Sequence, residues 1–229
     1  MTFSPGETRD PEAAAQVARA YRKLGRPVVL VPIRGQMHAG KAHVIRQARQ
    51  HRGLLIVAGV EGVTGVDLLV RPFGCPPRTS IGSAALTETF RWLTLLRPTD
   101  LYLGERDYRR LIEVQHLVTD YHLGVRVHAV PTLRDASGTP VSSRRIDADP
   151  GAAVSAALTA GAHAAERGEE AVLAAARAVL DAGGVAGEIE LLGGDLGEPR
   201  RGDARLFIRV GDYEDSAGVP LEIGFRNLQ

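Results

Sequence analysis

Residues 28–45 read VVLVPIRGQMHAGKAHVI, and this stretch decides how the rest of the chain is organised. An apolar run ends at Pro32, a polar turn containing glycine follows, and apolar residues then return at helical spacing. The pattern predicts a buried parallel strand that leads into the N-terminus of a helix, the arrangement that nucleotide-binding α/β folds use to hold phosphate. His38 lies in the turn and Lys41 in the first helical turn, where a donor and a cation can face an anion. A lysine there opposes the helix macrodipole unless an anion binds.

Length and composition restrict the class of protein. The 229 residues include 28 basic and 27 acidic side chains, a balance that excludes the large basic surface needed to bind nucleic acid or an anionic membrane. A single cysteine, Cys75, excludes an internal disulfide and fits a reducing compartment. The N-terminus lacks a signal pattern, and no apolar run reaches membrane-spanning length. We therefore expect a cytoplasmic protein.

Apolar runs and helical patterns alternate along most of the chain, which predicts a doubly wound α/β fold with a mostly parallel sheet. The expected strands are 27–33, 54–60, 66–70, 100–104 and 125–130, and the expected helices are 11–24, the segment up to Gln50, 83–96 and 107–122. Only residues 61–65 separate the second and third strands, whereas a parallel crossover needs roughly a dozen residues. We therefore expect those two strands to pair as a hairpin, or one of them not to be a strand.

A ligand of such a sheet lies at the carboxyl ends of its strands. Those ends carry His38, the GERD turn at 104–107 and the segment that follows Val130. The turn-rich residues 71–82 form a loop that can supply a substrate wall. The lone Trp92 is typical of core or interface packing.

The composition shifts after residue 150, where two alanine-rich helical patterns precede three short apolar runs. The helices are expected at 151–167 and 169–182, and the strands at 188–192, 206–210 and 221–225. We predict a nucleotide-binding domain at 1–147 and a small C-terminal α+β domain at 148–229. The seven histidines include no pair at metal-ligand spacing with a carboxylate companion, so the sequence predicts no protein-bound metal.

Three segments in the same order resemble the motifs of pantothenate synthetases. VPIRGQMHAGK (31–41) is similar to that family's VPTMGxLHxGH, RPTDLYLGERDYRRL (97–111) to its RPDxxxFGEKDYQQL, and VPTLRDASGTPVSSRR (130–145) to its VPTxRxxDGLAMSSRN. The alanine-rich tail is similar to the C-terminal domain of actinobacterial members. The resemblance implies a Rossmann-like nucleotidyltransferase domain with a small C-terminal lid, often as a homodimer. It also implies a ligase that uses ATP, with Mg²⁺ carried by the nucleotide, to join the small-molecule acid pantoate to the amine of β-alanine through an adenylate.

The resemblance assigns roles position by position. His38 matches the first histidine of HxGH, a donor to the phosphates, and Arg78 matches an arginine of the family's RPxHF segment that contacts the substrate. The remaining matches concern the nucleotide: Gly104, Asp107, Ser142, Ser143 and Arg144.

The chain departs from the family at four other positions of the motifs. Lys41 replaces the second histidine of HxGH, and Arg106 replaces the nucleotide-contacting lysine, so both are candidate catalytic cations with His38. Arg34 replaces the methionine of the first motif, beside the nucleotide, and Arg110 replaces a glutamine that holds pantoate. The family's NPxQF segment is missing, which indicates deletions near 60–65 and 74–78.

Three hypotheses follow from these motifs and departures. Under the first, the chain is an ATP-dependent ligase of the family that it resembles, in which Lys41 and Arg106 act as substitute phosphate cations. Under the second, it is a relative that activates a more anionic acid, since Arg34, Lys41 and Arg110 make the pocket more cationic. Under the third, it is a catalytically lapsed paralogue that binds nucleotide or a partner protein.

Overall fold

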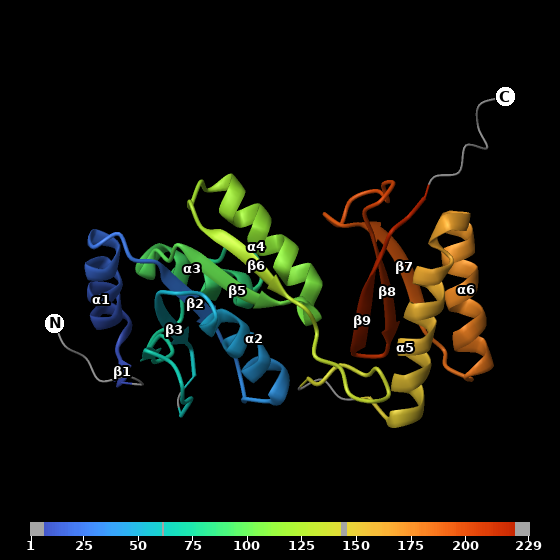
Figure 1. Ribbon diagram of the computed structural model, residues 1–229, viewed down its shortest axis with the longest axis horizontal. Coiled ribbons are helices and arrows are strands. Elements are labelled where there is room, and N and C mark those ends of the chain that lie inside the picture. The colour runs from blue at the N-terminus through green and yellow to red at the C-terminus, as the bar shows by residue number, and fades with distance from the viewer. Residues whose placement is uncertain (1–6, 61, 143–145, 223–229) are drawn as a thin grey trace. The chain divides into compact units, whose positions relative to one another are not determined.

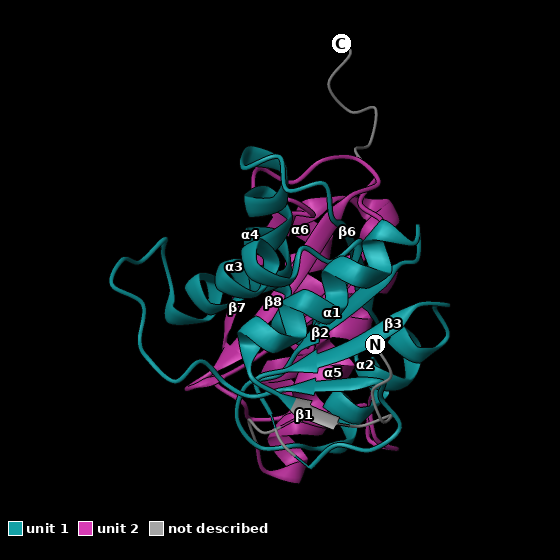
Figure 2. Cartoon of the chain, turned by 90° about the vertical axis from the view of Figure 1, so that its left-hand side faces the viewer, with its two compact units in different colours: residues 1–132 teal, residues 133–229 magenta. Residues whose placement is uncertain are grey.

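The structure is a computed structural model that describes residues 7–60, 62–142 and 146–222. It divides into two compact units, residues 1–132 and 133–229 (Figure 2). Each unit has its own sheet and its own apolar core. No helix of the described residues is long and apolar enough to cross a membrane.

Unit 1 is built on a six-stranded sheet in the order β1-β4-β3-β2-β5-β6, in which every neighbouring pair is parallel (Figure 1). Its elements are β1 (Glu7–Arg9), α1 (Pro11–Lys23), β2 (Val28–Pro32), α2 (Ala39–Arg49), β3 (Leu54–Ala58), β4 (Leu68–Val70), α3 (Ala84–Leu96), β5 (Asp100–Gly104), η1 (Glu105–Asp107), α4 (Tyr108–Asp120) and β6 (Arg126–Val130). The prediction of a doubly wound parallel sheet is confirmed. The short edge strand β1 has no strong sequence signal and was missed.

Both faces of this sheet are covered, which is why its central strands are apolar throughout. All five residues of β2 and all five of β3 are buried. On one face, β-strand side chains such as Leu30 pack with apolar residues of α1, α3 and α4 around Trp92, which is 1% exposed. On the other face, Val29 and Val31 pack against α2. Burial of these two apolar layers is the main stabilising contribution to unit 1.

The expected hairpin between the second and third strands is wrong, because β3 and β4 pair in parallel. The return path is short, since Leu68 at the start of β4 lies opposite Ile56 in the middle of β3. The turn begins at Gly59, which has a φ of 90° and at which an added Cβ would lie 2.5 Å from the Ile33 carbonyl oxygen. The described residues of the connection contain no helix. Instead, Val66 packs into the core on the α2 side of the sheet and covers part of that face.

Unit 2 is a small α+β unit, as the sequence indicates. It contains α5 (Ala148–His163), η2 (Ala165–Arg167), α6 (Glu169–Ala182), and an antiparallel sheet of β7 (Glu188–Gly193), β8 (Ala204–Val210) and β9 (Tyr213–Val219). Its core includes Val172, Leu180 and Leu206. The third strand lies earlier than expected: Leu221 and Glu222 are not in a strand, and 223–225 lies outside the described residues.

The boundary between the units also lies earlier than the predicted one at 147/148, because the segment after 132 packs within unit 2. Arg134 forms two hydrogen bonds with the buried carboxylate of Asp215, at 2.7 and 3.2 Å, and a third with the Gly138 carbonyl at 2.9 Å. The apolar pattern of the helices cannot reveal such an ion pair, so the sequence placed this loop with the preceding domain.

Candidate active site

The turn between β2 and α2 places His38 at the N-cap position of α2. Its backbone is extended, and its carbonyl accepts from Ala42 N at 3.0 Å, so the helix begins directly after it. Its ring Nδ1 is buried and has no hydrogen-bond partner among the described residues. Burial first, and the nearby Lys41 second, lower the pKa of His38. A neutral imidazole with an unsatisfied buried atom at a helix N-terminus is typical of a site that awaits a polar ligand.

Lys41 extends back over the same turn instead of pointing away from it. Its Nζ donates to the carbonyl oxygens of Arg34 and of Gln36, the latter at 2.6 Å. Burial lowers the pKa of this ammonium. Because an ammonium has three donors, two hold the turn in shape and one remains for a ligand.

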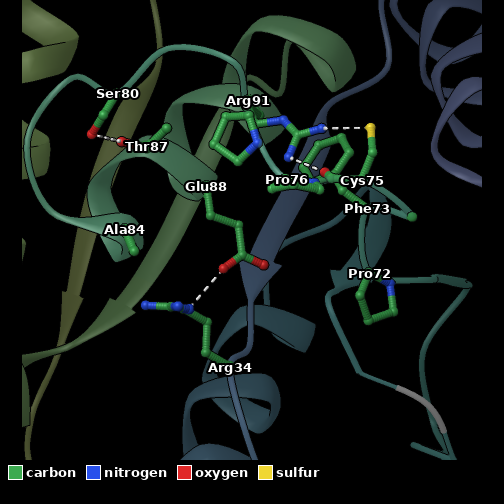
Figure 3. A pocket seen from close by; sticks show the side chains of 12 residues that line it. Arg34, Pro72, Phe73, Cys75, Pro76, Ser80, Ala84, Thr87, Glu88 and Arg91 are labelled. Atoms are coloured by element: carbon green, nitrogen blue, oxygen red, sulfur yellow. Dashed lines mark hydrogen bonds and ion pairs between the residues drawn. The ribbon is translucent and has the colours of Figure 1, made fainter.

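A cavity of about 440 Å³ opens beside this turn. Figure 3 shows Glu88 in the middle of it, between Arg34 and Arg91. Arg34 Nε lies 2.7 Å from Glu88 Oε2, so an arginine that follows β2 is held by a carboxylate of α3. The two side chains are 44% and 24% exposed, which leaves the pair open to the cavity.

The loop after β4 forms the opposite wall of the cavity, as the turn-rich residues 71–82 led us to expect. Phe73 stacks on the core residue Trp92 at a ring centroid distance of 3.8 Å, and the guanidinium of Arg91 lies 3.7 Å above the Phe73 ring. Arg91 also donates to the Cys75 carbonyl at 3.0 Å. These contacts attach the loop to α3 and fix the width of the cavity.

The end of β5 brings further charged groups to the same edge of the sheet. Asp107 is exposed at the N-cap of α4, Arg106 is half-buried, and Gly104 fits closely against Val44 of α2. The sequence placed these residues in the GERD turn at a strand end, and the structure has them there.

Arg110, in the first turn of α4, is the most confined cation of this group. Its Nη2 donates to Thr89 Oγ1 at 2.8 Å, while its buried Nε has no partner among the described residues. Burial is the main cause that lowers the pKa of Arg110; Asp107 and Glu88 raise it, and Arg34 lowers it. Arg110 therefore lies close enough to the Arg34–Glu88 pair to interact with it electrostatically. A guanidinium held in this way has a donor left for a carboxylate.

Not every predicted residue joins this group. Arg78 is exposed and does not line the cavity. Ser142 belongs to unit 2, and Ser143 and Arg144 lie outside the described residues.

The sequence analysis did not identify Glu88 and Thr89 of α3 as residues of this group. A polar pair within the apolar pattern of 84–96 was the available signal, but it does not show which edge of the sheet the pair faces.

A second polar cluster lies at the amino end of β5, where the sequence predicted no metal site. His51, Asp100 and His128 come from three separate segments, yet their ligand atoms all lie within 4.8 Å of one another. Sequence spacing missed the cluster because parallel pairing of β5 with β6, rather than a local motif, brings Asp100 and His128 together.

The six-stranded parallel sheet with helices on both faces, and the N-terminus of α2 that follows the carboxyl end of β2, define an α/β protein with a doubly wound, Rossmann-like fold of the nucleotidyltransferase type. Solved structures agree on the fold. A pantothenate synthetase from Thermus thermophilus has a TM-score of 0.72 at 20% identity, covering 93% of this chain and 99% of that one. A pantoate-beta-alanine ligase from Francisella tularensis, complexed with beta-gamma ATP and beta-alanine, has a TM-score of 0.62 at 17% identity, covering 92% and 97%.

Sequence comparison gives the family. Residues 83–192 match the family model described as pantoate-beta-alanine ligase. The pantothenate synthetase of Corynebacterium jeikeium is 35% identical over 291 residues, covering 100% of this chain and 95% of the relative, and that of Nocardia farcinica is 34% identical, covering 97% and 89%. The chain belongs to the pantoate–β-alanine ligase (pantothenate synthetase) family. The aligned length exceeds the 229 residues of this chain, so the alignment contains gaps in it, as expected for a shortened member.

Proposed function

We propose that the protein is an ATP-dependent ligase that joins an acid to an amine through an acyl adenylate. The acid carboxylate attacks the α-phosphorus of ATP and pyrophosphate leaves; the amine then attacks the acyl carbon and AMP leaves. The observation that carries the proposal is the buried, unpartnered Nδ1 of His38 at the N-terminus of α2, in a chain that belongs to this ligase family. The reaction needs positioned donors for developing charge rather than a protein nucleophile.

The nucleotide end of the site consists of His38, Lys41, Gly104, Arg106 and Asp107. His38, as a neutral imidazole, donates one hydrogen bond to a phosphate oxygen, and the third donor of Lys41 supports the same charge. Arg106 takes the place of the family's lysine as a planar fork rather than a point charge. The resemblance assigns Ser142, Ser143 and Arg144 to the same nucleotide, with Mg²⁺ arriving on it to offset phosphate charge.

The acid end is formed by Arg110 and the Arg34–Glu88 pair. Glu88 partly neutralises Arg34, and two carbonyl oxygens hold Lys41. Arg110 is then the cation with a donor left for the acid carboxylate. Of these three substituted cations, only Arg110 is then left to pair with a carboxylate of the acid. One available cation favours a monocarboxylate such as pantoate over the more anionic acid that the sequence alone suggested.

One observation favours a second candidate, a lapsed paralogue that binds nucleotide or a partner protein. Lys41 occupies the position of a family histidine, and its ammonium stabilises the turn by donating to two carbonyl oxygens of that turn. A residue whose main contacts are internal contributes less to phosphate charge than an oriented histidine does.

Release of AMP and pyrophosphate from Mg-ATP distinguishes the two candidates. The reaction is run with pantoate and β-alanine together and with each omitted in turn. We expect AMP only when both are present, and pyrophosphate exchange into ATP when the acid alone is present. ATP binding measured by calorimetry without AMP or exchange, for pantoate and for a panel of related acids, would support the lapsed paralogue.

A further inference from the structure

The amino end of β5 carries a buried anion surrounded by nitrogen ligands. Asp100 is 0% exposed, and its Oδ1 lies 2.9 Å from His128 Nε2 while its Oδ2 lies 3.4 Å from His51 Nε2. The two histidines are about a quarter and a third exposed, so the cluster opens to solvent on the imidazole side. None of these residues belongs to the proposed nucleotide or acid site.

The spacing of the three ligand atoms suits a transition-metal ion. Zinc binds imidazole nitrogen and carboxylate oxygen at about 2.0–2.2 Å, which places neighbouring ligand atoms of a tetrahedron about 3.3–3.5 Å apart. His51 Nε2 lies 3.4 Å from Oδ2 of Asp100, within that range, and His128 Nε2 lies 2.9 Å from Oδ1, slightly below it. With one ligand atom taken from each residue, no separation exceeds 4.8 Å. Shifts of less than about 1.5 Å would therefore complete a two-histidine, one-carboxylate set with an open position for water.

The surroundings also orient the first ligand. His51 Nδ1 lies 3.3 Å from the Tyr102 hydroxyl, so when Nδ1 carries the proton and donates it to that oxygen, the lone pair of Nε2 faces Asp100. This is the outer-shell contact that metal-bound histidines usually make. The ring of Tyr102 stacks on His128 at a centroid distance of 4.4 Å, which holds the second imidazole in place.

A guanidinium already offsets the charge of Asp100 and would compete with a metal. Arg126 donates from Nε to Oδ1 at 2.9 Å and from Nη2 to Oδ2 at 3.1 Å. Its side chain is 69% exposed, in contrast to the buried carboxylate, so it can rotate into solvent while a metal takes its place. Thr99 Oγ1 keeps its 2.6 Å bond to Oδ2 in either state.

We propose that His51, Asp100 and His128 form a binding site for a divalent transition-metal ion of the Zn²⁺ class, in which the ion replaces Arg126 as the counter-charge of Asp100. Zn²⁺ and Co²⁺ prefer imidazole with a single carboxylate, whereas Mg²⁺ and Ca²⁺ prefer oxygen ligands. The ion would tie the α2–β3 connection, β5 and the edge strand β6 together. The role is structural, at the sheet edge opposite the proposed active site.

The test uses untagged, chelator-treated full-length protein without nucleotide. Co²⁺ is titrated and followed by its visible absorption, and Zn²⁺ affinity is obtained by competition. We expect one ion per chain, with affinity more than about 10- to 100-fold weaker in His51→Ala and in His128→Ala, which exceeds the usual cost of losing an outer-shell partner. His116→Ala, an exposed histidine of the same unit, and Cys75→Ser should bind as the parent does.

Arg126→Met gives an independent readout that a misfolded variant cannot imitate. Removing the competing guanidinium should tighten Zn²⁺ binding, and circular dichroism checks that each variant keeps its fold. Absence of Co²⁺ or Zn²⁺ binding at millimolar concentration, binding unchanged in His128→Ala, or weaker binding in Arg126→Met would each overturn the proposal. Loss of ligase activity is not used as a readout, so the result is independent of the proposed function.

Discussion

The two ends of β5 carry opposite charge arrangements, although one strand of five residues connects them. At the amino end, the buried carboxylate of Asp100 is in contact with the guanidinium of Arg126 and with two imidazoles. At the carboxyl end, Arg110 follows the strand at the start of α4 and interacts electrostatically with Arg34 and Glu88. Arg34 and Glu88 form the ion pair that lines the cavity. One end suits a cation and the other suits an anion.

The two ends differ in whether their buried polar atoms have hydrogen-bond partners. Partnered atoms stabilise the fold, whereas unpartnered atoms indicate a place for a ligand. Both oxygens of Asp100 have partners, and those partners hold its pKa well below the usual range even though burial alone raises it. At the other end, His38 Nδ1 and Arg110 Nε are buried and lack partners among the described residues. A buried donor without an acceptor costs about 1–3 kcal/mol, so such atoms point to the place where a ligand binds.

Replacement of Lys41 should have the largest effect, because this residue both shapes the turn and supplies charge. We expect Lys41→Ala to slow adenylate formation by about ten- to a thousandfold, the scale of losing one oriented donor. Pyrophosphate exchange in the presence of the acid measures this step.

Lys41→Gln separates the two roles, since the amide can still donate to the carbonyls of Arg34 and Gln36 but carries no charge. A rate in Lys41→Gln as slow as in Lys41→Ala assigns the effect to charge, and a parental rate assigns it to the turn. An unchanged rate in Lys41→Ala would remove this residue from the mechanism.

Asp100→Asn tests the other end of the strand by its stability. We expect a loss of about 3 kcal/mol at pH 7, since charge-assisted bonds contribute about 1.5–3 kcal/mol each and a buried amide cannot replace them. Urea denaturation measures the loss, and Asp120→Asn, an exposed aspartate of the same unit, is the control. A cost equal to that of the control would mean that the amino end is not an anchored anion.

The pH dependence of stability follows from the same carboxylate. The folded-state pKa of Asp100 is depressed, so its contribution is present above the unfolded pKa of about 3.9 and is lost as the pH falls toward the folded pKa. Between pH 5 and pH 2, the parent should therefore lose more stability than Asp100→Asn does. Parallel curves in urea titrations across that range would contradict the depressed pKa.

Arg110 tests whether the carboxyl end holds the acid. Arg110→Ala should raise the KM for the acid by about 10- to 100-fold, the equivalent of one charge-assisted bond, and leave the KM for ATP unchanged. Arg110→Gln introduces the glutamine of the family motif, and its KM for the acid should lie between those of the parent and of Arg110→Ala. Arg109→Gln on the same helix is the matched control. Equal losses for acid and ATP would reject the assignment.

Much of this comparison was accessible from the sequence, because burial on both faces leaves a clear apolar signal in β2 and β5. Parallel strands then place His38, Arg106 and Arg110 at one edge, so their common location in the fold was predicted from the sequence. The parts that were missed depend on tertiary pairing. Glu88 enters from a helix whose orientation is set by packing, and His51 and His128 meet Asp100 only through the sheet.

The pairing of β3 with β4 shows the same limit. The sequence argument against parallel pairing depended on strand boundaries. It placed the second strand at 54–60 and the third at 66–70, which left only five residues to connect them. In the structure β4 starts at Leu68 and covers only three residues, so the chain returns over a short distance. Strand boundaries are the least certain feature of a sequence pattern, and here they decided the topology.

The smallest expected effect concerns Thr89, which positions Arg110 without contacting substrate. Its hydroxyl accepts from Arg110 Nη2 at 2.8 Å and donates to the Ala85 carbonyl at 2.9 Å. Thr89→Val keeps the shape of a residue that is 1% exposed but removes the acceptor, at a cost of about 1 kcal/mol, or roughly fivefold in the KM for the acid. Because the guanidinium itself remains, kcat should change less than KM. Thr89→Ser restores the hydroxyl and should restore the parental KM. A Thr89→Ser variant as impaired as Thr89→Val would show that packing of the methyl group, rather than the bond to Arg110, sets the position of this cation.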